Sequence, residues 1–232
     1  MAEFRNEEFF NDLRDCNSNI LVAGMPGSGK SVIINGIINS ILMKCPSKHS
    51  MVLIDLKKVE LSRYAQTPHC LEIARTTQEA EQALRHVLRF VENRYDQMLE
   101  TGADMYEGME LHLIIDEMAQ LMITSKPCHK LIQEIVQICR AANVQLICAT
   151  QSPKATVIPT EITMAFDVIL GLHTRNAQDS RNILGERGCE ELPKCGYSLV
   201  KYSDEVELKR VKVPFISKEE IQKLIDWRLA GN

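Results

Sequence analysis

The chain has 232 residues, of which 45% are hydrophobic and 25% charged, the proportions of an ordinary globular protein. Its net charge of −4 argues against a uniformly basic surface for nucleic acid, although it leaves room for a basic lining inside a ring. No apolar run reaches about 18 residues, the length that a membrane span needs. Residues 1–14 lack the apolar core of a signal peptide, so we expect a cytoplasmic protein without direct membrane insertion.

Short apolar runs alternate with stretches of helical periodicity along the whole chain. The expected elements, in chain order, are a strand at Ile20–Ala23, a helix from Lys30 to Leu42, a strand at Met51–Asp55, a helix at Thr77–Glu100, a strand at Leu111–Ile115, a helix at Lys130–Ala142, strands at Val144–Ala149 and Val168–Leu172, paired strands at Tyr197–Tyr202 and Val206–Val213, and a helix at Lys218–Leu229.

Continuously apolar strands that alternate with helices are typical of a parallel sheet covered on both faces. The last two strands alternate in polarity and flank Ser203-Asp204-Glu205, so they predict a hairpin at the sheet edge. We therefore expect an α/β fold with a mostly parallel central sheet and a C-terminal edge hairpin. Residues 1–19 form a lead-in segment in this interpretation, and residues 20–232 form one domain.

The eight cysteines include no Cys-x-x-Cys pair, and several stand in apolar runs, as in Ile147-Cys148-Ala149. A zinc site built from cysteines, or a disulfide framework, needs closer pairs. We expect buried, reduced thiols.

The segment after the first strand fits the phosphate-loop pattern G-x-x-x-x-G-K-[ST]. Its residues are Gly24, Met25, Pro26, Gly27, Ser28, Gly29, Lys30 and Ser31. The glycines let backbone amides close around phosphates, and the following helix adds a partial positive charge. Lys30 is expected to reach the β- and γ-phosphates of ATP, and the Ser31 hydroxyl to bind Mg²⁺. The alternative is a glycine-rich turn without a ligand.

The strand at Leu111–Ile115 runs directly into Asp116-Glu117, which places two carboxylates at the carboxyl edge of the sheet, where open α/β folds bind ligands. Asp116 is expected to hold Mg²⁺ through water, and Glu117 to orient and deprotonate the attacking water. Gln151 follows a neighbouring strand and is a candidate sensor of the γ-phosphate. Its alternative role is that of a capping or turn residue.

Further segments occur in a characteristic order after the phosphate loop. They are "IDLKKVEL" from Ile54, "TPHCLEIARTTQEAEQAL" from Thr67, "ENRY" from Glu92, "IIDE" from Ile114, "CRAANVQLICATQSP" from Cys139 and "QDSRNILGERGCEEL" from Gln178. From about Asp12 to Tyr202 this series resembles the motor domain of the FtsK/SpoIIIE family of DNA translocases. The resemblance implies a RecA-like core that works as a homo-oligomer, a hexameric ring with ATP at the subunit interfaces and double-stranded DNA in the pore.

The same resemblance implies that Arg140, in "CRAANVQL", reaches the nucleotide of the neighbouring subunit. Arg175 and Arg181 are further candidates, and a solvated helix-end residue is the alternative for Arg140. The chain departs from the family pattern at Ser152, where the family usually has arginine. Lys154 is therefore the expected DNA contact in that loop.

Two other functions stay open at this point. Members of the same family drive protein export, as in type VII secretion, or the coupling step of conjugation, and the lining of the pore distinguishes these substrates. A nucleotide-binding module that assembles without hydrolysis is a third interpretation. It is disfavoured because both the phosphate loop and the acidic pair are intact.

Overall fold

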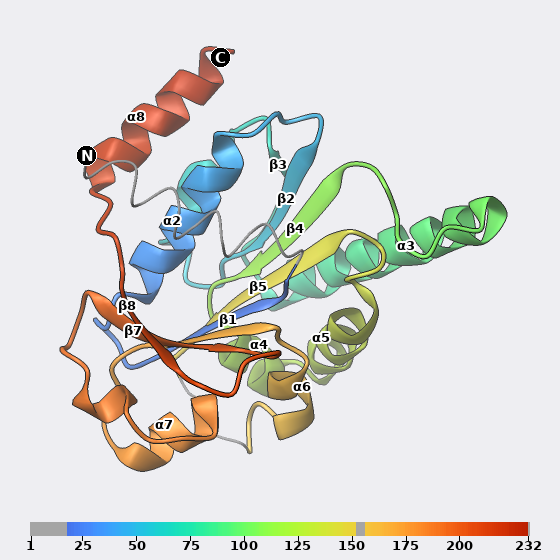
Figure 1. Ribbon diagram of the computed structural model, residues 1–232. Helices are drawn as coiled ribbons and strands as arrows, with labels where there is room; N and C mark the ends of the chain where they lie inside the picture. Colours follow the sequence, from blue (N-terminus) through green and yellow to red (C-terminus); the bar gives the residue numbers. More distant parts are fainter. Residues whose placement is uncertain (1–17, 152–155, 232) are drawn as a thin grey trace.

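The computed structural model describes residues 18–151 and 156–231, which form an α/β fold around one sheet (Figure 1). The sheet has eight strands in the order β3-β2-β4-β5-β1-β6-β7-β8. Their bounds are β1 (Ile20–Ala23), β2 (His49–Ile54), β3 (Cys70–Ala74), β4 (Glu110–Ile115), β5 (Val144–Thr150), β6 (Val168–Gly171), β7 (Tyr197–Tyr202) and β8 (Lys209–Lys212). β1 to β6 are parallel to one another, whereas β7 and β8 pair antiparallel at the edge.

Helices pack on both faces of this sheet, and each face has its own apolar core. α2 and α8 cover one face, while α3, α4 and α5 cover the other (Figure 1). The helices are α2 (Lys30–Leu42), α3 (Thr77–Thr101), α4 (Met118–Thr124), α5 (Lys126–Ile138), α6 (Thr160–Met164), α7 (Ala177–Leu184) and α8 (Lys218–Leu229), with 3₁₀ turns η1 (Ser62–Tyr64) and η2 (Cys189–Glu191).

The apolar runs predicted the central strands correctly, because β1, β2, β4, β5 and β6 are buried along almost their whole length. The edge hairpin is also confirmed, although β8 is shorter than expected. α5 begins at Lys126 rather than Lys130, since the Ser125 side chain caps it by accepting from Cys128 N. It ends at Ile138, and Asn143 then adopts a left-handed conformation with φ of 54° before β5.

The cysteines of the described segments are free, as expected. Four of them are buried, namely Cys128, Cys139, Cys148 and Cys189. The prediction of burial is wrong for Cys45 and Cys195, which are exposed, because both lie in turns outside the sheet and its covering helices. Cys16 lies outside the described residues.

Over residues 18–151 and 156–231, none of the helices combines the length and the apolar character needed to cross a bilayer.

The order of the strands decides which residues meet. β1 lies between β5 and β6, and β5 lies between β1 and β4. The segments that follow β1, β4 and β5 therefore leave the same edge of the sheet side by side. These segments carry the phosphate loop, the acidic pair and Gln151.

Candidate functional site

The loop between β1 and α2 is held open by its glycines and fixed by neighbouring strands. Gly27 and Gly29 have φ of 79° and 105°, a conformation that residues with a Cβ rarely adopt. Gly24 lies so close to Leu172 that an added Cβ would be 2.7 Å from its Cβ. The amides of Gly24 and Met25 donate to Thr150 O (3.3 Å) and His173 O (3.0 Å). The loop is therefore a rigid cradle rather than a loose turn.

This cradle has unsatisfied groups that suit an anion. The Ser28 hydroxyl is buried without a hydrogen-bond partner within the described structure. The Lys30 ammonium, 8% exposed, folds back over the loop and donates to Gly24 O (2.7 Å) and Met25 O (2.9 Å). Burial lowers the pKa of Lys30 to about 8, against the opposing effect of Glu117. A phosphate bound in the loop would take the place of these two carbonyls as the partner of the Lys30 ammonium. It would also accept hydrogen bonds from the free amides at the N-terminus of α2.

The two adjacent carboxylates lie in the turn between β4 and α4, and they have different surroundings. Burial raises the pKa of Asp116 to about 6, with Lys57 opposing the rise. Glu117 is 8% exposed and is held by three donors. Lys57 Nζ lies 3.3 Å from its Oε2, while Thr150 Oγ1 (3.3 Å) and Gln151 N (2.9 Å) donate to its Oε1.

A cavity of about 1570 Å³ lies along the loop, and it contains Ser31, Asp116 and Gln151. Its far wall is formed by the edge hairpin and the segment after it, from Lys212 to Phe215. A second hollow of about 340 Å³ adjoins it and is lined by Glu117, Lys57 and Arg175 among others. Ligand pockets usually measure roughly 300–1,000 Å³, so the larger cavity is big enough for a nucleotide.

Residues that could hold a metal are also in place. The Ser31 hydroxyl at the start of α2 and the Asp116 carboxylate both line the larger cavity, beside the loop that would bind phosphates. Oxygen ligands of this kind suit Mg²⁺, which usually takes one or two protein oxygens together with phosphate oxygens and water. The donor set therefore fits a nucleotide-bound Mg²⁺.

The structure thus brings together most of the residues expected at the site: the loop, Lys30, Ser31, Asp116, Glu117 and Gln151. Sequence reasoning gave no role to Lys57 and did not single out Thr150, both of which contact Glu117. For Lys57 the only signal was its place in "IDLKKVEL", directly after a strand that ends at the same edge. Lys154 and Ser152 lie outside the described residues.

Arg140 lies away from this site. Its Nη1 donates to Asp167 Oδ1 at 3.0 Å, and Asp167 in turn accepts from the Asn19 amide at 2.8 Å. Asn19 and Asp167 directly precede β1 and β6, so this contact marks the amino edge of the sheet. The phosphate loop is at the carboxyl edge. Arg140 therefore takes no part in the nucleotide site of its own chain.

Comparisons with known proteins agree with the motifs. Residues 1–112 match the sequence profile of the FtsK/SpoIIIE family. Proteins named DNA translocase FtsK are similar over most of the chain. The one from Oceanobacillus iheyensis is 36% identical over 229 residues, which cover 89% of this chain and 29% of that protein. The one from Streptococcus pyogenes is 35% identical over 230 residues, 90% of this chain and 29% of that protein. The chain thus spans less than a third of these relatives' length.

Solved structures show the same fold at lower sequence identity. The conjugation coupling protein TcpA of pCW3, solved with ATPgS, superposes with a TM-score of 0.77 at 22% identity, over 91% of this chain and 65% of that one. ATPases 2 and 3 of EssC from Geobacillus thermodenitrificans give a TM-score of 0.78 at 14% identity, over 93% of this chain and 43% of that one. With its phosphate loop, acidic pair and ordered motifs, the chain belongs to the FtsK/SpoIIIE family.

Proposed function

We propose that this chain is the motor of a DNA translocase, an ATPase that moves double-stranded DNA through a ring of identical subunits. The observation that carries the proposal is the meeting of three residues at one sheet edge: Lys30 and Asp116 line a cavity large enough for a nucleotide, and Glu117 lines the hollow beside it. The similarity to proteins named DNA translocase FtsK supports DNA as the substrate. In this proposal residues 20–232 are the motor domain and residues 1–19 lead into it.

Each residue has a role that its position supports. The loop amides and the Lys30 ammonium bind the β- and γ-phosphates of ATP. Ser31, and Asp116 through water, would hold Mg²⁺, which when bound would supply positive charge beside the phosphates. Glu117 accepts the proton of the attacking water, and Gln151, which lines both cavities, positions the γ-phosphate. Catalysis is then mainly positioning and charge neutralisation.

The Lys57–Glu117 contact gives the base a defined resting position. Glu117 must face the γ-phosphate to act, and in the described arrangement its two oxygens are engaged by Lys57, Thr150 and Gln151. Gln151 N and Thr150 Oγ1 both donate to Oε1 of Glu117, whereas Lys57 donates to its Oε2. We infer that turnover needs Lys57 to release this oxygen.

Assembly completes the site in our proposal. Arg140 contributes from one subunit to the nucleotide of the next, within a hexameric ring, and Lys154 contacts DNA phosphates in the pore. An arginine acting in trans typically raises the rate by about 10³-fold or more.

ATP turnover with and without linear double-stranded DNA tests the function. We expect DNA to stimulate turnover at low salt and to do so less at moderate salt, because each basic contact releases counterions. Lys30→Ala and Glu117→Gln are matched controls, since the first removes the phosphate contact and the second removes only the base. Turnover that survives both variants would exclude this site as the catalytic centre. Turnover that depends on Glu117 but ignores DNA, with no DNA binding at low salt, would favour a polypeptide substrate.

A further inference from the structure

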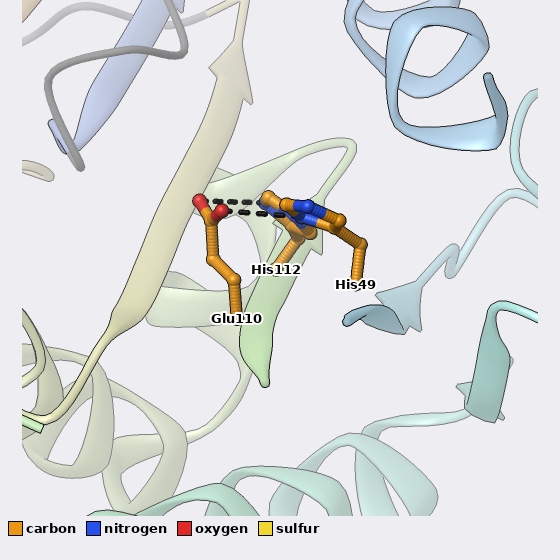
Figure 2. Close-up of side chains that lie close together, drawn as sticks. All are labelled: His49, Glu110 and His112. Atoms are coloured by element: carbon orange, nitrogen blue, oxygen red, sulfur yellow. Dashed lines mark hydrogen bonds and ion pairs between the residues drawn. The ribbon is translucent and has the colours of Figure 1, made fainter. Parts of the chain in front are cut away.

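Two imidazoles and a carboxylate meet at the amino edge of the sheet, away from the nucleotide site (Figure 2). His49 begins β2, while Glu110 and His112 lie on the neighbouring strand β4. The strands pair so that His49 stands opposite Glu110. One ligand atom from each residue lies within 4.8 Å of the others. Asp116 follows the other end of β4, which at about 3.3 Å per residue is roughly 15–20 Å away.

The protonation of His112 follows from its hydrogen bonds. The side chain of Gln145 donates from Nε2 to Ser18 O at 2.8 Å, so its Oε1 faces His112 as an acceptor. Oε1 lies 2.8 Å from His112 Nδ1, which must therefore carry the proton. His112 is 1% exposed, so a charge on its ring would be buried, and with Nδ1 protonated its Nε2 presents a lone pair to the cluster.

The lone pair on His112 Nε2 and the carboxylate of Glu110 compete for one proton, the one on His49 Nδ1. His49 Nδ1 lies 3.4 Å from His112 Nε2 and 3.1 Å from Glu110 Oε2. A neutral His49 has at most one proton on Nδ1, so it can serve only one of these two acceptors. A cation between the three atoms would satisfy all of them without a proton.

The spacing suits zinc. Zinc binds imidazole nitrogen at about 2.0–2.1 Å with a tetrahedral arrangement, which puts neighbouring ligand atoms about 3.3–3.4 Å apart. Two separations are near that edge length, 3.1 Å from His49 Nδ1 to Glu110 Oε2 and 3.4 Å from His49 Nδ1 to His112 Nε2, while Glu110 Oε1 lies 3.8 Å from His112 Nδ1. Mixed nitrogen and oxygen ligands favour zinc over magnesium or calcium, which take oxygen ligands. Gln145 accepts a hydrogen bond from His112 Nδ1, and ligating histidines usually make such a bond through their other ring nitrogen.

We propose that His49, Glu110 and His112 form a Zn²⁺ site with water as the fourth ligand. The side chains of His49 and Glu110 are 16% and 14% exposed, so solvent reaches the cluster from their side. The rings of His49 and His112 stack with an interplanar angle of 17°, so a bound ion requires the His49 ring to tilt, and the separations of 3.1 and 3.4 Å belong to the ion-free arrangement. The bound ion would tie the amino ends of β2 and β4 together and stabilise this side of the sheet.

The test uses the full chain after treatment with a chelator. Zinc affinity is measured by competition with a chromophoric chelator, and Co²⁺ serves as a spectroscopic probe of the ligands. We expect one equivalent of Zn²⁺, a rise in melting temperature when it is added, and a Co²⁺ spectrum of a four-coordinate site without thiolate charge-transfer absorption.

Glu110→Gln and His49→Gln each remove one ligand while roughly preserving size, and each should weaken zinc binding by about tenfold or more. His112→Gln should do the same, but its buried position makes it the variant most prone to unfold. His86→Gln is the matched control, because His86 pairs with Glu72 on the surface at 3.0 Å and should leave zinc affinity unchanged.

Three results would overturn the proposal. They are a wild-type chain that binds no zinc, zinc affinity that is equal in wild type, Glu110→Gln and His49→Gln, and a Co²⁺ spectrum dominated by thiolate absorption. The last would assign the metal to cysteines such as the exposed Cys45 and Cys195. None of these measurements depends on nucleotide or DNA, so they test the zinc site independently of the proposed motor function.

Discussion

Nucleotide affinity should fall as the pH rises through 8, because the free chain holds Lys30 with a lowered pKa. Burial brings this pKa to about 8. Between the phosphates of a bound nucleotide the ammonium stays protonated, so binding at high pH requires proton uptake. The protonated fraction of the free chain drops from about nine-tenths at pH 7 to about one-tenth at pH 9, and apparent affinity should therefore drop about tenfold.

The assay is calorimetric titration with a non-hydrolysable ATP analogue and Mg²⁺ at pH 7, 8 and 9. Repeating it in buffers of different ionisation enthalpy measures the proton taken up. Lys30→Arg is the control, because its guanidinium stays charged from pH 7 to pH 9. Any pH effect that comes from titration of the nucleotide itself will appear equally in the wild type and in this variant. The reasoning is refuted if the wild-type affinity falls no more than that of Lys30→Arg, or if no proton is taken up at pH 9.

Three other outcomes are expected. Glu117→Gln should retain nucleotide binding but lose about 10²-fold or more in single-turnover phosphate release; turnover near wild type would remove Glu117 from the role of base. At limiting Mg²⁺, wild-type turnover should decline below about pH 6, because protonation of Asp116 competes with metal binding, and Lys57→Gln should shift this decline to higher pH, since Lys57 opposes the raised pKa of Asp116; pH–rate profiles at limiting Mg²⁺ measure the shift, and an unchanged profile would contradict it. Arg94→Ala should lower the free energy of unfolding by about 3 kcal/mol in urea titrations, because it leaves one buried and two partly buried carbonyls without their charged donor; a loss under about 1 kcal/mol would mean that water replaces the guanidinium.

The apolar runs predicted the centre of the fold because burial on both faces leaves a strong signal. β3 left no such signal. It lies at the sheet edge, only Ala74 in it is buried, and Leu71 is 59% exposed. Its residues stand out in the sequence only as part of the longer motif "TPHCLEIARTTQEAEQAL". An edge strand takes its conformation mainly from its hydrogen-bonded neighbour, which a local pattern cannot supply.

The motif "ENRY" shows why a family motif does not by itself reveal a role. Its Arg94 is 3% exposed and donates to the carbonyls of Ala142, Asn143 and Met109, with its guanidinium over the rings of Phe90 and Tyr106 at 4.0 and 4.2 Å. It joins α3 to the start of β4 and to the turn before β5. The residue is structural, and nothing in its spacing distinguished it from a functional arginine.

The candidate site likewise contains some residues that the sequence predicts and some contacts that it does not. The loop and the acidic pair could be predicted, since a strand followed by a glycine-rich turn or by carboxylates places them at a known edge. The opposite surroundings of Asp116 and Glu117, and the contacts of Glu117 with Lys57 and Thr150, depend on which strands are neighbours. Strand order is a long-range property, so the sequence could not provide it.

The family resemblance placed Arg140 ahead of Arg175 as the arginine acting in trans, and the positions of the two residues now make opposite predictions. Arg175 lines the hollow that contains Glu117 of its own chain. Arg140 lies at the other edge of the sheet, paired with Asp167, so it can complete a nucleotide site only in a neighbouring subunit. Loss of either side chain should reduce turnover, but mixed rings separate the two roles.

In a ring with head-to-tail contacts, each site combines the loop of one subunit with the arginine of the next. Lys30→Ala chains lack a working loop but keep Arg140, and Arg140→Ala chains have the reverse defect. When the two variants are mixed equally, about one interface in four has an intact loop on one side and an intact Arg140 on the other. The mixture should therefore regain roughly a quarter of wild-type turnover. Lys30→Ala mixed with Arg175→Ala should regain none, because both defects affect the site of their own chain. A mixture of Lys30→Ala and Arg140→Ala that stays as inactive as its components would show that Arg140 does not act between subunits.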